Sequence, residues 1–424
     1  MSPVHSITAP DLPIQRRHAS PTPETLFPEY PDDLSPKQMA GNLAPVAGQR
    51  GSISDCKTAD CPPSSQAKER PQDRSHSPAR NFAADPSKRA NARLVGIARL
   101  AAASPPVETQ RKSAERPEYF LLPVKSILNR CDSQRVPFEW TINPYRGCEF
   151  ACKYCYARYT HEYMELDGGE FEKKIYVKKD AGPLLAWDVA RKYSYASEAS
   201  GGTRTDHIAI GTATDPYQPA ERCYEVTQAI LEELARHRGL ELGIVTKSNL
   251  ILRDINLLQK VAEQNQLFVN LTATTLNSEL ARILEPRAPR PDLRLNTVRK
   301  LNESGLNAGV ICAPVLPGIT DSPHDLEALV KATAEAGGKY IYANPLFLKP
   351  CSAAVFLPFL EKQFPQLVAS YRERFNNRAF LPQAYHKRIS QLMARLRQKH
   401  GIGGGRHSQS AHRRPEGEEQ LTLF

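Results

Sequence analysis

The sequence predicts an α/β protein whose core is a partial (β/α)6 barrel. Six short apolar segments alternate with polar turns and helical stretches between residues 138 and 343, and this alternation is typical of a parallel sheet. The segments are apolar along their whole length, as expected of strands that are buried on both faces. Right-handed crossovers between such strands allow the sheet to curl.

The strands and helices of this repeat can be placed by residue number. Strands are expected at 138–142, 208–212, 242–246, 267–271, 308–312 and 340–343. Helices are expected at 184–193, 220–237, 254–264, 278–284, 292–303 and 322–336. In the second of these helices, Val226, Ile230 and Leu234 fall on one face, and Pro219 occupies the first helical position.

Residues 1–115 are predicted to be a mostly disordered basic, Pro-rich extension. They are rich in Pro, Ser, Arg, Gln and Ala, and their apolar residues have no regular period, so they cannot bury enough surface to offset the entropy of ordering. Residues 93–100 are the exception, since they are expected to form a short helix or to dock on the core. Cys56 and Cys61, at C-x4-C, are interpreted as incidental.

The core is expected to span 116–350, followed by helices over 351–400 and a flexible tail over 401–424. Residues 356–375 are long and apolar, with Pro358 and Pro365 as interruptions. Residues 383–399 carry one apolar stripe. We interpret this segment as a helix that covers the barrel, in preference to a helix that binds nucleic acid. The stripe consists of Ile389, Leu392, Met393 and Leu396.

The composition favours an anionic partner. The formal net charge is +10 and the pI is about 9.1, which favours partners such as nucleic acid, although much of this charge is expected on the flexible ends. Nine cysteines without an apolar leader indicate a reducing compartment, hence the cytoplasm. The sequence contains no run of eighteen apolar residues, so no membrane span is predicted.

The chemistry is expected in residues 143–157, which hold Cys148, Cys152 and Cys155 at the spacing C-x3-C-x2-C. Thiolates suit iron–sulfur clusters, Zn or Cu(I). A closed zinc site needs four ligands, and His161 is the candidate for the fourth. The alternative is a four-iron cluster with three cysteine ligands and one iron that is open to a small molecule.

The flanking sequence favours the open cluster. An apolar strand precedes the loop, Pro144 and Gly147 end that strand, and residues 156–159 open a helix. A strand, a metal-binding loop and a helix in this order match the way in which an α/β barrel presents reactive groups at the C-terminal ends of its strands.

The cysteine spacing, with the aromatic Tyr154 before the last cysteine, resembles the radical S-adenosylmethionine (radical SAM) superfamily. Residues 143–157 together with Thr212–Glu221 resemble the branch that contains spore photoproduct lyase and the DNA repair photolyase-like proteins. The similarity runs from about Tyr119 to about Leu348.

This resemblance implies a radical SAM core and a [4Fe-4S] cluster bound by Cys148, Cys152 and Cys155. It also implies S-adenosylmethionine as a second cofactor, bound to the open iron through its amino and carboxylate groups. Reduction then cleaves its sulfonium bond and releases a 5′-deoxyadenosyl radical, while the protein orients the cofactor. An electron donor such as flavodoxin or ferredoxin is implied as a partner.

Contacts to S-adenosylmethionine are expected at the strand ends. Many family members carry a Gly-Gly-Glu-like stretch after the second strand, whereas this sequence has 211–215 there. By the resemblance, Lys247 would meet the methionine carboxylate, or else it is an ordinary surface lysine. Side chains at the ends of the fourth and fifth strands would contact the ribose and adenine. The candidates are Thr212, Thr214, Asp215, Lys247, Asn270, Thr272 and Ile311.

The remaining cysteines receive simpler interpretations. Cys312 is expected at a strand end, facing the cavity, where it would donate a hydrogen atom as a cysteine does in spore photoproduct lyase. A buried structural thiol is the preferred interpretation. Cys131, Cys223 and Cys351 are not spaced for a second cluster.

The leading hypothesis is a radical SAM enzyme, lyase-like, that acts on nucleic acid in DNA repair. One alternative keeps the enzyme but makes the substrate a protein or a small molecule. Another is a nonenzymatic cysteine–metal module in a DNA-associated scaffold. The catalytic residues beyond the cluster ligands are unassigned.

The C-terminal residues Gln420, Leu421, Leu423 and Phe424 predict a partner. Apolar residues at a disordered end have nothing local to bury them. The pentapeptide 420–424 resembles the Gln-Leu-x-Leu-Phe peptide by which bacterial repair and replication proteins bind the sliding clamp. Leu423 and Phe424 would fill an apolar pocket and Gln420 would bond its rim.

Overall fold

The computed structural model describes residues 96–104, 117–133, 136–193 and 207–404. All of them belong to the second of the chain's two units, Arg70–Phe424. The expectations for Cys56, Cys61 and the C-terminal peptide 420–424 fall outside the described residues.

A curled sheet of six parallel strands forms the core, as predicted. The order across the sheet is β10-β9-β8-β7-β6-β3-β2, in which only β2 is antiparallel to its neighbour. Each of the six parallel strands therefore ends in a loop at the same edge of the sheet. The strands are β2 (Leu128–Arg130), β3 (Trp140–Ile142), β6 (His207–Ile210), β7 (Glu241–Thr246), β8 (Gln266–Thr272), β9 (Asn307–Val315) and β10 (Ile341–Pro345).

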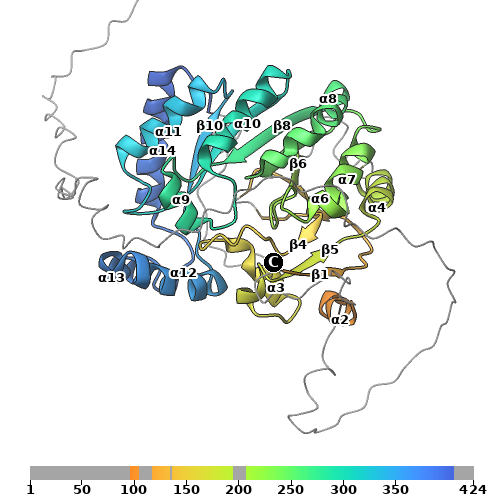
Figure 1. Ribbon diagram of the computed structural model, residues 1–424, viewed down its shortest axis with the longest axis horizontal. Coiled ribbons are helices and arrows are strands. Elements are labelled where there is room, and N and C mark those ends of the chain that lie inside the picture. The colour runs from red at the N-terminus through yellow and green to blue at the C-terminus, as the bar shows by residue number, and fades with distance from the viewer. Residues whose placement is uncertain (1–95, 105–116, 134–135, 194–206, 405–424) are drawn as a thin grey trace, which may run out of the picture. The chain divides into compact units, whose positions relative to one another are not determined.

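Helices follow the strands and surround the sheet, as Figure 1 shows. Pro at the first helical positions of α10 and α11 and the side-chain cap of Ser322 mark helix starts that the sequence indicates. The helices of this layer are α4 (Ala181–Asp188), η5 (Val189–Tyr193), α6 (Glu221–Tyr224), α7 (Val226–Leu234), η6 (Asn249–Asp254), α8 (Ile255–Gln264), α9 (Ser278–Leu284), α10 (Pro291–Glu303), α11 (Pro323–Glu335) and α14 (Gln383–His400).

A second, three-stranded sheet lies beside the first, with the order β1-β5-β4. The strands are β1 (Glu118–Leu121), β4 (Tyr145–Arg146) and β5 (Lys174–Val177), and the short helices near them are η3 (Tyr156–Arg158), α3 (Tyr159–Glu162) and η4 (Gly168–Glu170). The short helix expected near residue 96 is α2 (Gly96–Ala103), whose Ala101 packs with Leu122 and Tyr176.

One expected helix differs in extent from the prediction. The helix expected at 220–237 is split into α6 and α7 at Glu225, which has a φ of +50°, because the Glu221 carboxylate accepts the first amides of α7. In the C-terminal segment, α12 (Pro350–Gln363) begins where helices were expected, and the interruption expected at Pro365 separates it from η7 (Pro365–Leu367) and α13 (Val368–Arg374). Pro358 lies inside α12 without ending it.

The largest hydrophobic cluster fills the space between the sheet and its helices. Ile389, Met393 and Leu396 of α14 are buried in it, so this helix covers the barrel as expected. Cys312 is fully buried in the same cluster, next to Val310 in the alternation of β9. The expectation that its thiol faces the cavity is therefore wrong, and the preferred interpretation as a buried structural thiol is correct.

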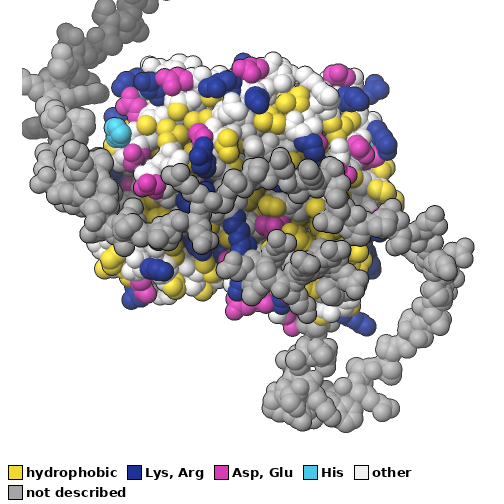
Figure 2. Space-filling model, viewed as in Figure 1, with side chains coloured by type: hydrophobic (Ala, Val, Ile, Leu, Met, Phe, Trp, Pro, Cys, Tyr) yellow, Lys and Arg dark blue, Asp and Glu magenta, His cyan; other side chains and the backbone are white. Residues whose placement is uncertain are grey.

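The positive charge is not confined to the ends of the chain. The described residues hold 36 of the 56 Lys and Arg and 29 of the 46 Asp and Glu, which leaves +7 of the total +10 on the described part. Basic, acidic and hydrophobic side chains are mixed on the face that Figure 2 shows. Within the described residues, no helix is both long and apolar enough to cross a bilayer.

One close approach inside the barrel requires a glycine. A Cβ at Gly309 would lie 2.5 Å from ring atoms of Tyr340. The Tyr340 hydroxyl in turn donates to the Asn270 Oδ1, 3.1 Å away, and to the Val269 carbonyl, 3.2 Å away. The ring of Tyr340 therefore occupies the space beside β9 and links β10 to β8.

We expect Gly309→Ala to lower the free energy of unfolding by about 1–3 kcal/mol, because the added methyl group overpacks the interior against a ring that cannot move away. Denaturant unfolding followed by circular dichroism measures the effect. Gly169→Ala is the matched control, since its Cβ would approach only the Asp167 side chain at 3.1–3.9 Å. Equal midpoints for the two variants would contradict the prediction.

Candidate active site

The three cysteines of the C-x3-C-x2-C motif lie in the loop that follows β3 and β4. Cys148 and Cys152 are buried and Cys155 is half-buried. Burial raises the pKa of all three thiols, and their charges act on one another. Gly147, with a φ of +82°, begins the loop where a Cβ would lie 2.6 Å from the Lys174 carbonyl oxygen. Only glycine fits this turn.

His161 is not directed at the thiols. One ring nitrogen lies 3.0 Å from the Lys174 carbonyl oxygen, and the ring packs edge-on against Phe171 and Tyr176. Its role as the fourth ligand of a zinc site is therefore not supported. Across the described residues, no three His, Cys, Asp or Glu side chains are arranged to hold a metal ion as they stand.

The turn after β6 holds the cysteine loop by side-chain hydrogen bonds. The Thr214 hydroxyl donates to the Gly147 carbonyl at 2.6 Å, and the Gln218 amide donates to the same carbonyl at 3.2 Å. The Gln218 side-chain oxygen accepts from the Glu149 amide at 2.9 Å. Thr214 and Gln218 are both buried, so these bonds fix the backbone on either side of Cys148.

Thr212 and Asp215 occupy opposite ends of the same turn. The Thr212 hydroxyl accepts from Asn143 at 3.2 Å, and its carbonyl accepts from the Tyr156 hydroxyl. The Asp215 carboxylate accepts from the Thr246 hydroxyl at 2.6 Å and from the Lys247 amide at 2.7 Å. The turn thus joins the cysteine loop on one side to the end of β7 on the other.

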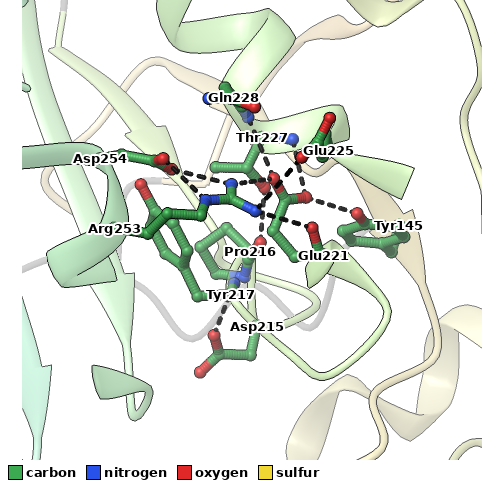
Figure 3. Close-up of polar contacts among 10 residues, drawn as sticks. All are labelled: Tyr145, Asp215, Pro216, Tyr217, Glu221, Glu225, Thr227, Gln228, Arg253 and Asp254. Atoms are coloured by element: carbon green, nitrogen blue, oxygen red, sulfur yellow. Dashed lines mark hydrogen bonds and ion pairs between the residues drawn. The ribbon is translucent and has the colours of Figure 1, made fainter. Parts of the chain in front are cut away.

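Behind this turn, Glu221 is fully buried and accepts several hydrogen bonds, which Figure 3 shows. The Tyr145 hydroxyl lies 2.5 Å and the Arg253 Nη2 3.0 Å from its carboxylate. The amide of Thr227 donates to it at 2.9 Å. The residue therefore ties β4, α7 and η6 to the segment that carries Asp215.

A buried charge network lies on the far side of the cysteine loop. The Glu285 carboxylate pairs with Arg294 and lies 3.9 Å from the Lys247 ammonium. The Tyr154 hydroxyl donates to Glu285 and lies 3.1 Å from the Thr274 hydroxyl. Since Tyr154 precedes Cys155, this network positions the second half of the loop.

The charges in the network decide its protonation. Burial alone would raise the pKa of Glu285, but Arg294 and Lys247 more than offset it and hold that pKa below its usual value. Burial opposes the charge of Lys247, yet Glu285 and Cys152 raise the pKa of this lysine above its usual value. Lys247 is therefore a partly buried cation next to a cysteine thiol, not an ordinary surface lysine.

The other predicted cofactor residues lie on β8 and β9. Asn270 is buried and bonds the Ile244 carbonyl and Tyr340, so its side chain is engaged within the barrel. Thr272 and Ile311 lie directly opposite each other across the two strands, and both are buried. The Thr272 carbonyl accepts from Arg294 at 2.9 Å, which places this pair next to the charge network.

Strand-end reasoning missed Glu285 and Arg294, because Glu285 ends α9 and Arg294 lies in the first turns of α10. The signal in the sequence is a carboxylate and an arginine that flank the Pro-rich turn 286–291. Gln218 and Asn143 lay inside the quoted motif segments, but their spacing gave them no assigned role. The side-chain oxygen of Gln218 accepts from the Glu149 amide, and that of Asn143 accepts from the Ala213 amide, so both residues hold backbone near the cysteines.

Comparison with known proteins identifies the family. The family model described as the radical SAM superfamily matches residues 142–331. A protein of Mycobacterium tuberculosis that is named only as uncharacterised is 34% identical over 282 residues, which cover 66% of this chain and 80% of the relative. The chain belongs to the radical SAM superfamily. It is thus an enzyme of a class that uses a [4Fe-4S] cluster and S-adenosylmethionine, and the scaffold without enzymatic activity is no longer an alternative.

Two further similarities are consistent with this assignment. An uncharacterised protein of Methanocaldococcus jannaschii is 28% identical over 242 residues, which cover 57% of this radical SAM chain and 82% of the relative. The solved structure of spore photoproduct lyase complexed with dinucleoside spore photoproduct matches with a TM-score of 0.50 at 16% identity, over 68% of this chain and 80% of that one. The latter similarity supports the fold.

We expect Glu285→Gln to destabilise this radical SAM protein by about 3–5 kcal/mol near neutral pH, because it leaves Arg294 buried without its counter-charge. The carboxyl pKa is held below its usual value in the folded state. Its stabilising contribution is therefore present above the ordinary carboxyl pKa and is lost as the pH falls.

Denaturant unfolding at several pH values measures this effect. The difference between wild type and variant should shrink as the pH falls, since protonation removes the same charge from the wild type. Glu279→Gln, on the exposed face of α9, is the control and should be near neutral. A difference that does not depend on pH would contradict the argument.

Proposed function

We propose that this radical SAM enzyme acts on nucleic acid and holds its cluster through Cys148, Cys152 and Cys155. The observation that carries the cluster assignment is the placement of three thiols in the loop after β4 and of the ammonium of Lys247, paired with Glu285 at 3.9 Å, after β7. Three cysteine ligands leave one iron of a four-iron cluster open. When bound, the cluster and S-adenosylmethionine supply one-electron cleavage to a 5′-deoxyadenosyl radical, with flavodoxin or ferredoxin as the electron donor.

The residues around the loop fit this pair of cofactors. Lys247 provides a positive charge beside Cys152, where a carboxylate of the bound cofactor is neutralised without full exposure to water. Buried side chains surround the cysteine loop, among them Phe150 and Tyr154. They exclude water, and this limits side reactions of a radical.

The remaining contacts to the cofactor are assigned to three residues, Thr212, Thr272 and Ile311. Thr212 lies at the edge of the cysteine loop, where its half-buried hydroxyl accepts from Asn143 and orients the turn. Thr272 and Ile311 form an adjoining polar and apolar pair, suited to a ribose and an adenine face. A positioning role is proposed for Thr214, Asp215 and Asn270, because the polar atoms of their side chains already bond other groups of the protein.

Nucleic acid is the favoured substrate because the described residues carry a net positive charge. Residues 350–404 alone hold nine Lys or Arg and two Asp or Glu. A polyanion is attracted to such a segment over several ångströms, and the attraction is reduced by salt. A protein or small-molecule substrate is the second candidate, and a salt-independent affinity for that substrate would favour it.

We further propose that the terminal residues Gln420, Leu421, Leu423 and Phe424 bind the sliding clamp. The support is the sequence of the peptide, which follows a polar segment. A short peptide that orders on binding loses part of its contact energy to that ordering, so an affinity in the micromolar range is expected, roughly −8 kcal/mol.

We expect Cys152→Ala to abolish the iron–sulfur cluster. After anaerobic reconstitution with iron and sulfide, iron content and 5′-deoxyadenosine after reduction are the two measurements. Cys223→Ala, which removes an exposed thiol on α6, is the control and should retain both. Cys56→Ala and Cys61→Ala should also retain the cluster. A full complement of iron in Cys152→Ala would refute the ligand assignment.

The clamp proposal is tested by titration of a bacterial sliding clamp with the peptide of residues 416–424. We expect saturable binding that is lost when Leu423 and Phe424 are replaced by alanine, because these side chains supply the apolar contact. A peptide with Thr422→Ala serves as the control, since this position lies between Leu421 and Leu423. No binding by the natural sequence, or equal binding by the alanine version, would remove the clamp as a partner.

A further inference from the structure

A row of aromatic side chains lies directly beside Cys155. The rings are those of Tyr156, Tyr159, Tyr163 and Phe347. Together with Lys349, whose ammonium contacts two of them, they form the surface that we call the aromatic rim. Tyr156 is 41% and Tyr163 45% exposed. They are two of only four large hydrophobic side chains that the described residues expose, so this concentration next to the proposed cluster ligands is unusual.

The members of the aromatic rim contact one another in sequence. Tyr159 and Tyr163 meet edge to face with their centroids 5.4 Å apart. The Lys349 ammonium lies 3.9 Å from the centroid of Tyr159 and 6.0 Å from that of Phe347. The ring of Phe347 is 6.1 Å from that of Tyr156. The rings and the ammonium thus form one continuous surface.

The aromatic rim joins the first and the last of the six parallel strands. Its tyrosines come from η3 and α3, after β3, while Phe347 and Lys349 follow β10. The Ser352 hydroxyl of α12 donates to the Cys155 carbonyl at 2.8 Å, and the Tyr156 hydroxyl donates to the Thr212 carbonyl. A ligand on the aromatic rim would therefore lie beside the cysteine loop.

Two cations adjoin these rings without a counter-charge in ion-pair contact among the described residues: Arg146 and Lys349. Arg146 donates to the Thr160 carbonyl at 3.2 Å, and its charge acts on Tyr159 and Tyr163. Its buried Nε has no hydrogen-bond partner. Glu162 is the acidic neighbour of Lys349, but the two do not form an ion pair.

Lys178 is a third basic residue, and its charge interacts with that of Arg146. The side chain lies behind Arg146 and is only 4% exposed. Burial, with a further contribution from Arg146, lowers the pKa of Lys178 to about 7. Near neutral pH Lys178 is therefore only partly charged, and an anionic ligand nearby would favour its charged form.

A purely structural role does not account for all members of the aromatic rim. Half-buried Tyr159 and Phe347 help to close the gap between the loops after β3 and β10. The exposed faces of Tyr156 and Tyr163 contribute little to that closure. Exposed aromatic rings next to unpaired cations are the arrangement with which proteins bind unpaired bases and their phosphates.

Building on the proposed function, we propose that the aromatic rim binds single-stranded nucleic acid, with bases stacked on Tyr156 and Tyr163 and phosphates held by Arg146 and Lys349. Duplex bases are stacked on one another and cannot offer their faces to these rings. The strand would therefore present an unstacked base next to the cysteine loop, where the reaction is proposed to occur.

The test uses the full, reconstituted chain under anaerobic conditions and a fluorescein-labelled oligothymidylate of roughly 12 nucleotides, a length within the range of single-strand binding sites. Fluorescence anisotropy at several salt concentrations gives the affinity and its salt dependence. We expect Tyr163→Ala to weaken binding roughly tenfold with an unchanged salt slope, because stacking and not charge is lost. We expect Lys349→Ala to reduce the salt slope by about 0.7, the value for one phosphate contact of a single strand.

Two matched controls separate the aromatic rim from general effects. Trp187→Ala removes an equally exposed ring on α4, 49% exposed with Arg191 4.9 Å above it, and should leave binding unchanged. Lys362→Ala removes an exposed lysine elsewhere on α12 and should leave the salt slope unchanged. A duplex of the same length should bind more weakly than the single strand.

The outcomes distinguish this inference from the proposed function. Tight binding by the wild type with no effect of Tyr163→Ala would overturn the aromatic rim as the binding surface and leave the substrate class intact. No binding of any nucleic acid, by protein that still forms 5′-deoxyadenosine, would overturn both. Equal binding of a random copolymer of Glu and Tyr would assign the aromatic rim to an acidic polypeptide instead.

Discussion

The buried carboxylate of Glu285 is the charge on which the geometry of the cysteine loop depends. It holds Arg294, Tyr154 and Lys247 within one network, and its position fixes where a positive charge can persist beside Cys152. A lone carboxylate at this depth would be protonated, and a lone lysine would lose its proton. Each is kept charged by the other, so the loop, the turn after β6 and the α9–α10 segment are energetically one unit.

Much of the fold could be predicted from the sequence, because the strands are apolar along their length and their spacing matches a β/α repeat. Six parallel strands were expected and are present. Periodicity could not reveal the break at Glu225, because a side chain from the preceding helix causes it. The direction of the Cys312 thiol could not be predicted either. Both faces of this strand are buried and apolar, so the sequence does not show which face packs against the helices.

In the candidate site, too, residues in local sequence patterns could be predicted, whereas residues brought together by long-range contacts could not. The cysteines were found because their spacing is local and rare, and Lys247 because it ends a strand. Glu285 comes from the end of α9 and Arg294 from the start of α10, where no periodic pattern indicates function. The aromatic rim was equally hidden, because Tyr156 and Phe347 are far apart in the chain and meet only when the first and last strands approach each other. Long-range contacts of this kind follow from the fold and not from any short segment.

The bonds around Gly147 and Tyr154 come from side chains of the protein and not from any metal. The loop backbone therefore has a scaffold of its own, independent of its inorganic occupant. Oxygen destroys exposed iron–sulfur clusters, and a loop shaped only by its cluster would collapse with it. The hydrogen bonds around this loop would keep its backbone in place if a cluster bound there were lost, so a new cluster could be inserted into the same polypeptide.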